Sequence, residues 1–151
     1  MNTVQVAVES KWADSAHCKS ESISQDLIRL VLVKRQNPAA RCIFLLAGSA
    51  TKLTSVLDLP PFTKSSKKNI GLRANLTETR ITFDRERPTH MAAFSEAIRD
   101  WREVSNIPAS FVAKSYGLHP NQTDAGTVRF QAIAWEVTEV CEKDLKGANA
   151  W

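Results

Sequence analysis

Glu9 and Lys11 are the first residues of the chain whose types and spacing suggest chemistry. They lie in the second half of the segment VAVESKW, in which valines at every second position predict a strand over residues 3–9. Glu9 and Lys11 have the same parity, so both side chains leave the same face of that strand. Such a pair is either a surface salt bridge of little energetic weight or half of a metal-dependent active site.

The elements that follow are those of a βαβ unit. An apolar stripe at helical spacing predicts a helix over residues 21–36, with Ser22 and Gln25 at the spacing of a capping box. The continuous apolar run RCIFLLAG, residues 41–48, predicts a strand buried on both faces, as in a parallel sheet. We therefore expect the two strands to be parallel neighbours with the helix packed across them.

The rest of the chain extends this unit into one α/β domain over residues 1–151. The predicted fold class is a single mixed β-sheet with a βαβ crossover and flanking helices. The further elements expected are a short helix over 50–57, an extended segment over 76–83, a helix over 89–104, and strands over 110–116 and 127–138.

Composition sets broad limits on the class of protein. The chain has 151 residues, of which 43% are hydrophobic and 24% charged, which is enough to build a core. Three widely spaced cysteines argue against a disulfide framework or a zinc knuckle, and Cys42 is expected to be a core thiol. No apolar stretch reaches transmembrane length and no signal-peptide core is present, so we expect no membrane partner and a cytoplasmic location. The net charge of +4 is compatible with a nucleic-acid partner.

Three segments in order resemble a known family. VAVESKW, then QDLIRLVLVK, then RCIFLLAG are similar to the later part of the core of PD-(D/E)xK, or restriction-endonuclease-like, nucleases. In that family a strand ending in acid-x-lysine precedes a helix, often with a glutamine near its start, and then a buried parallel strand. The resemblance covers residues 4–48.

The resemblance implies hydrolysis of phosphodiester bonds in nucleic acid with Mg²⁺ or Mn²⁺. It implies that Glu9 binds the metal, aided by the backbone carbonyl of Ser10. Lys11 would position water and neutralise the scissile phosphate. Gln25 or Asp26, on the following helix, would position this group, and Asp26 is also a candidate metal ligand.

Other residues near or beyond the motif have two interpretations each. The basic run Lys64, Lys67 and Lys68 is a candidate nucleic-acid contact, although a solvated loop is the commoner explanation of such a run. Trp12 would stack on a base or, more commonly for an aromatic residue, pack in the core.

One feature departs from the family pattern. Its members carry a further metal-binding aspartate on a preceding strand, whereas only eight residues, none of them acidic, precede Glu9. The chain is then a fragment or mis-started reading frame of a longer nuclease, a degenerate member, or one in which Asp14, Glu21 or Asp26 substitutes.

Two function classes stay open: a metal-dependent nuclease, and a non-catalytic binding or assembly module descended from the same fold. Without the family's preceding strands, the first strand would expose an edge. We expect the C-terminal strands to cover it, or a second copy to pair with it.

Overall fold

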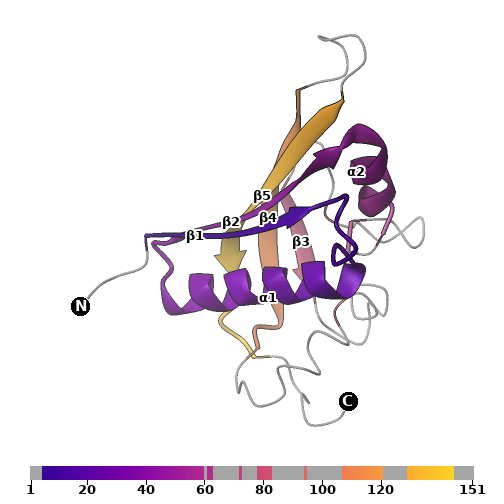
Figure 1. Ribbon diagram of the computed structural model, residues 1–151. Coiled ribbons are helices and arrows are strands. Elements are labelled where there is room, and N and C mark those ends of the chain that lie inside the picture. The colour runs from indigo at the N-terminus through magenta and orange to yellow at the C-terminus, as the bar shows by residue number, and fades with distance from the viewer. Residues whose placement is uncertain are drawn as a thin grey trace.

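The computed structural model describes residues 5–59, 61–62, 72, 78–82, 94, 107–120 and 129–144. They form one five-stranded mixed sheet with two helices, in the strand order β1-β2-β5-β4-β3 (Figure 1). Only β1 and β2 are parallel, and every other neighbouring pair is antiparallel. The elements are β1 (Val6–Trp12), α1 (Ser20–Gln36), β2 (Arg41–Ser49), α2 (Ala50–Leu57), β3 (Glu78–Thr82), β4 (Ser110–His119) and β5 (Phe130–Val140).

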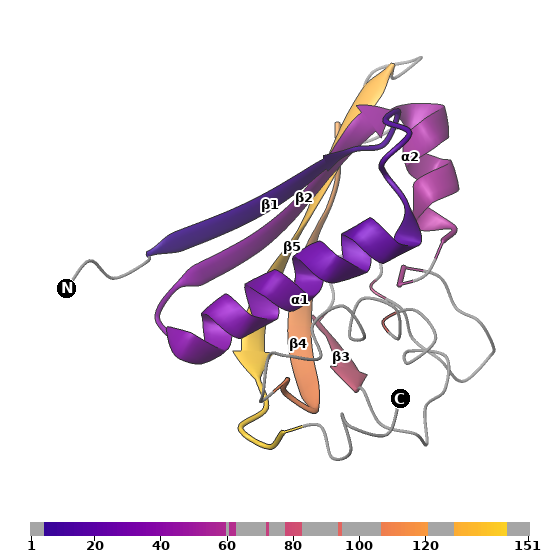
Figure 2. The same ribbon diagram turned by 60° about the horizontal axis from the view of Figure 1, so that its bottom comes forward.

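The predicted βαβ unit is confirmed. β1 and β2 are parallel neighbours, with Val6 opposite Arg41 and Trp12 opposite Ala47. The helix between them packs across both strands (Figure 2). The capping box predicted at Ser22 and Gln25 is wrong, because the N-cap is Lys19 and Ser22 is already the third helical residue. Its hydroxyl donates to the carbonyl of His17 at 2.7 Å, and its Oγ accepts a hydrogen bond from Lys19 N at 3.3 Å, so Ser22 stabilises the helix start from the third helical position.

The core lies on one face of the sheet, which we call the covered face. There Phe44 and Trp135 pack against each other and against Phe62, with ring centroids 4.8–6.4 Å apart. The buried residues of α1 and α2 complete this core. Burial of these large apolar side chains is the main stabilising contribution to such a sheet–helix layer.

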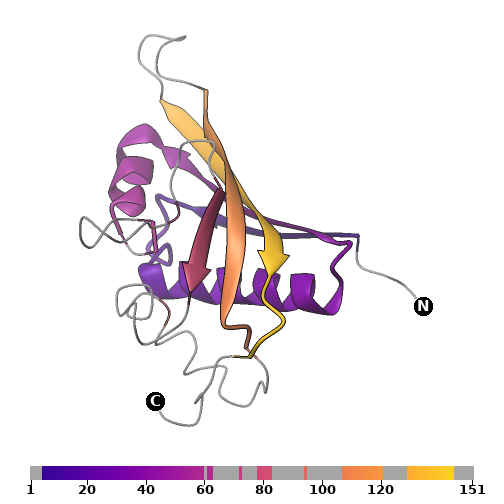
Figure 3. The ribbon, with the colours of Figure 1, turned by 180° about the vertical axis from the view of Figure 1, so that it is seen from behind.

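The other face, which we call the open face, is uncovered by either described helix. Figure 3 shows it with the strands in front of α1. Along β2 buried and more exposed residues alternate, and Leu45 is 36% exposed. The prediction that this strand is buried on both faces is therefore wrong, because α1 and α2 pack on one side only. Among the described residues of the open face, six large apolar side chains are exposed: Val6, Val8, Trp12, Leu45, Tyr116 and Phe130.

β1 forms an open edge of the described sheet. Of the two alternatives expected for this edge, cover by the C-terminal strands is wrong for the described strands, because β5 pairs with the opposite side of β2, and pairing with a second copy stays a prediction. Arg41 N donates to Gln5 O at 2.9 Å, and Ala13 N donates to Ala47 O at 2.7 Å. Odd-numbered residues thus direct their backbone groups toward β2, and the even-numbered residues between them direct theirs outward.

Two of the predictions concern segments that the structure describes only in part or not at all. Lys64, Lys67 and Lys68 lie outside the described residues. Within 89–104 only Phe94 is described; it is helical, buried and edge-on to Phe111.

The predicted short helix, extended segment and C-terminal strands are confirmed as α2, β3, β4 and β5. No helix in the described part of the chain is long and apolar enough to cross a membrane.

Candidate functional site

β1 and α1 together position the residues that the sequence singled out. Glu9 and Lys11 share the covered face of β1, as their parity predicts, and β1 continues past them to Trp12. Asp26 faces them from the second turn of α1. The pair therefore lies inside the strand and beneath the helix, instead of at an exposed strand end.

Four side chains form what we call the ion-pair cluster: Glu9, Lys11, Asp26 and Arg29. Lys11 Nζ lies 2.9 Å from Asp26 Oδ2. Arg29 Nη1 donates to Asp26 Oδ1 at 2.9 Å and lies 3.9 Å from Glu9 Oε1. The Asp26 side chain is 3% exposed, against 23% for Lys11 and 47% for Arg29. Asp26 is thus the base of the cluster, and the two cations and Glu9 form its solvent side.

The buried Asp26 carboxylate depends on this cluster. Its Oδ2 is buried and forms no hydrogen bond among the described residues, so Lys11 reaches it only as an ion pair. A buried carboxylate without a cation would be strongly destabilising, and Lys11 and Arg29 compensate for its burial. Cys18 lies close by; burial raises the pKa of its thiol, Lys11 opposes that shift and Asp26 adds to it. The raised pKa disfavours the thiolate, which is the reactive form of cysteine.

The cluster of one chain does not fit Mg²⁺ or Mn²⁺. It holds two carboxylates and two cations, and Arg29 Nη1 is within 4 Å of both carboxylates. Among the described residues no group of three or more His, Cys, Asp or Glu side chains is placed to hold a metal ion. Mg²⁺ requires a near-octahedral shell of oxygens, which two carboxylates already paired with cations do not supply.

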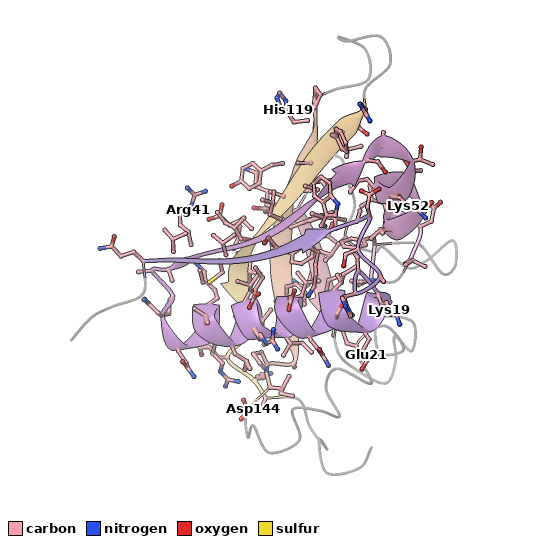
Figure 4. All side chains as sticks on the ribbon, in the orientation of Figure 1. Lys19, Glu21, Arg41, Lys52, His119 and Asp144 are labelled. Carbon is pink, nitrogen blue, oxygen red and sulfur yellow. The ribbon has the colours of Figure 1, made fainter. Side chains whose placement is uncertain are left out.

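The remaining site residues expected from the sequence are the aiding ligand Ser10, the positioning residue Gln25 and the alternative acid Glu21. Ser10 has its side chain on the open face, and its backbone groups point to the open edge. Gln25 is half-buried, one residue before Asp26. Glu21 is exposed at the start of α1, near Lys19 (Figure 4).

Asp14, a candidate substitute for the missing metal-binding aspartate, instead bonds the start of α2. Its carboxylate accepts hydrogen bonds from Ser49 N at 2.7 Å and Ser49 Oγ at 2.6 Å. Those two bonds hold the pKa of Asp14 below its usual value, and Lys52 lowers it further. Ser49 is the N-cap of α2, so Asp14 connects the end of β1 to the start of that helix. Gly48 permits this approach, because a Cβ there would lie 2.8 Å from Asp14 Oδ2.

Sequence reasoning missed Arg29 and a network on the open face. Arg29 lies three residues after Asp26, a spacing that places both on one helix face. On the open face Arg41, labelled in Figure 4, donates to both carboxylate oxygens of Glu136, at 3.0 and 3.1 Å. The Tyr116 hydroxyl also donates to Glu136. Arg41 is the main cause that lowers the pKa of Glu136.

The prediction that Trp12 packs in the core is wrong. Trp12 is 49% exposed on the open face, because its even position in β1 directs it away from α1. Its ring packs against Phe130 of β5, with centroids 6.0 Å apart.

No protein-family model, curated protein or solved structure matches the chain. The case for a function accordingly depends on the residues and their geometry.

Proposed function

We propose that the chain carries the acid-x-lysine half of a restriction-endonuclease-like nuclease centre, acting on phosphodiester bonds of nucleic acid. The observation that supports this most is the convergence of Glu9, Lys11 and Asp26 between β1 and α1. These are the residue types, and the elements, that the resemblance over residues 4–48 implies. A further carboxylate from outside the described residues of one chain is needed to complete the centre.

The two cations of the cluster suit a phosphodiester. Arg29, with about half of its side chain exposed, presents a planar guanidinium that matches two phosphate oxygens. Lys11 adds a point charge where negative charge develops on the phosphate. Asp26 holds the Lys11 ammonium in place from below, so we assign it a positioning role. The net charge of +4 also favours the binding of an anionic partner.

The test is cleavage of labelled single- and double-stranded DNA and RNA in Mg²⁺ or Mn²⁺. Lys11→Met is expected to reduce the cleavage rate by about 100-fold or more, the usual scale for a group acting at the reacting phosphate. Lys52→Met is the matched control, because Lys52 is an exposed lysine on α2 outside the cluster. Equal loss in both variants, or no cleavage by the unmutated chain, would exclude the proposal.

A second candidate function is a non-catalytic assembly module of the same fold. The mutual pairing of all four charges in the cluster favours it, as do the six exposed apolar side chains of the open face. Calorimetry separates the two candidates. The absence of heat on titration with Mg²⁺ or Mn²⁺, together with the absence of cleavage, would make the module the better account.

A further inference from the structure

The open edge of β1 has a pattern that selects one partner. Val6, Val8 and Ser10 direct their backbone N–H and C=O groups outward, and among the described residues no strand pairs with them. An unpaired strand edge is a template for a further strand. The same edge displays Glu9 and Lys11 on the covered face, and Val8 and Trp12 on the open face.

Charge decides how a second β1 would pair with this edge. In an antiparallel pair the outward-directed residues face each other, so a two-fold axis passes at a residue, and the registers central to β1 place it at Val8, Glu9, Ser10 or Lys11. An axis at Glu9 opposes two glutamates, and an axis at Lys11 opposes two lysines. An axis at Val8 opposes Glu9 to Ala7 and Lys11 to Gln5, so neither ion faces an opposite charge. An axis at Ser10 opposes Glu9 to Lys11 twice and Val8 to Trp12 twice, which is favourable on both faces.

We propose that two copies of this chain join edge to edge through β1, antiparallel, with the two-fold axis at Ser10. The partner is a second copy because the charge and apolar patterns of β1 are self-complementary in that register and in neither neighbouring one. The two sheets become one continuous sheet, and the exposed apolar rows of the two open faces meet at the axis.

This pairing supplies the carboxylate that one chain lacks. Cross-strand neighbours have Cβ atoms about 4.5–5.5 Å apart, so the second copy's Glu9 faces Lys11, which already contacts Asp26. Each centre then combines the four residues of one copy's ion-pair cluster with Glu9 of the other copy, so that three carboxylates meet there. This consequence rests on the proposed nuclease function, whereas the pairing itself does not.

Cysteine cross-linking tests the register. With the axis at Ser10, the two Ser10 Cα atoms lie about 5.5 Å apart, within the range of a disulfide. The two Val8 residues are then offset by four positions, about 14 Å along the strand, and cannot bond. In a Cys141→Ser background, which leaves only the buried Cys18 and Cys42, we expect Ser10→Cys to give a covalent dimer on mild oxidation. Val8→Cys should stay uncross-linked. The reverse result would overturn the register.

Sedimentation of the full chain tests the pairing without cysteines. Ser10→Pro removes an outward N–H that β2 does not use, so we expect a folded monomer where the unmutated chain is a dimer. Glu9→Lys places a lysine opposite Lys11 on each side of the axis. Because like charges repel, this variant should weaken association at least tenfold. A monomeric unmutated chain at about 100 μM, or a Ser10→Pro dimer, would refute the pairing. A dimer that does not cleave nucleic acid would contradict only the nuclease function. Cleavage by a monomer would contradict only the pairing through β1.

Discussion

Replacing Lys11 by methionine tests how much the cluster contributes to folding. Lys11 Nζ lies 2.9 Å from a carboxylate that is 3% exposed, and methionine keeps the apolar stem without the charge. Removing one partner of a fully buried pair costs about 3–5 kcal/mol. Water reaches the partly exposed Lys11, and Arg29 keeps its bond to Asp26 Oδ1, so part of that cost is offset. We expect a loss of about 1.5–3 kcal/mol in the free energy of unfolding.

Urea unfolding followed by tryptophan fluorescence measures this loss, because Trp135 is buried in the core. A double-mutant cycle with Asp26→Leu should give a coupling of about 1–2 kcal/mol, since the double variant leaves no buried charge unpaired. Lys52→Met, an exposed control on α2, should change stability by less than about 0.5 kcal/mol. A Lys11→Met effect as small as the control would refute the view that Asp26 needs Lys11.

Two further predictions concern other parts of the fold. Gly48→Ala should lower the free energy of unfolding by about 1–3 kcal/mol, because its Cβ would lie 2.7 Å from Ala13 Cβ; an unchanged thermal midpoint would contradict this. Arg41 lowers the pKa of Glu136 below its ordinary 4.5, so near that pH the unfolded chain binds more protons than the folded one. The stabilisation is present above pH 4.5 and is lost as the pH falls through the folded pKa; Glu136→Gln should flatten that part of the stability profile, and an equally steep profile would contradict the assignment.

The βαβ unit was predictable because its signals are local. Alternating valines, a helical apolar stripe and a compact apolar run each specify an element without reference to the rest of the chain. What those signals do not carry is which faces other elements will cover. The sequence therefore predicted that β2 is buried on both faces and that Trp12 packs in the core. In the structure α1 and α2 cover the same side of the sheet, which leaves Trp12 and the other face of β2 more exposed.

The candidate site was predictable to the same degree. Parity placed Glu9 and Lys11 on one face, and proximity in sequence suggested Asp26, which the structure brings to 2.9 Å from Lys11. Arg29 could have been found from its three-residue spacing to Asp26. The bond between Asp14 and Ser49 joins residues 35 positions apart and left no local signal.

Mixing the unmutated chain with Glu9→Gln tests the central claim most directly, namely a nuclease centre shared by two copies. Glu9→Gln is expected to abolish cleavage as a pure protein. In a mixed dimer each centre contains one substituted Glu9, either its own or the one from the other copy, so neither centre is whole. At equal mixing a quarter of the dimers carry no substitution, so about a quarter of the rate of the unmutated chain at the same total concentration should remain. If about half of that rate remains, each centre uses only its own Glu9 and the shared centre is contradicted; if the unmutated chain cleaves nothing, the nuclease function is.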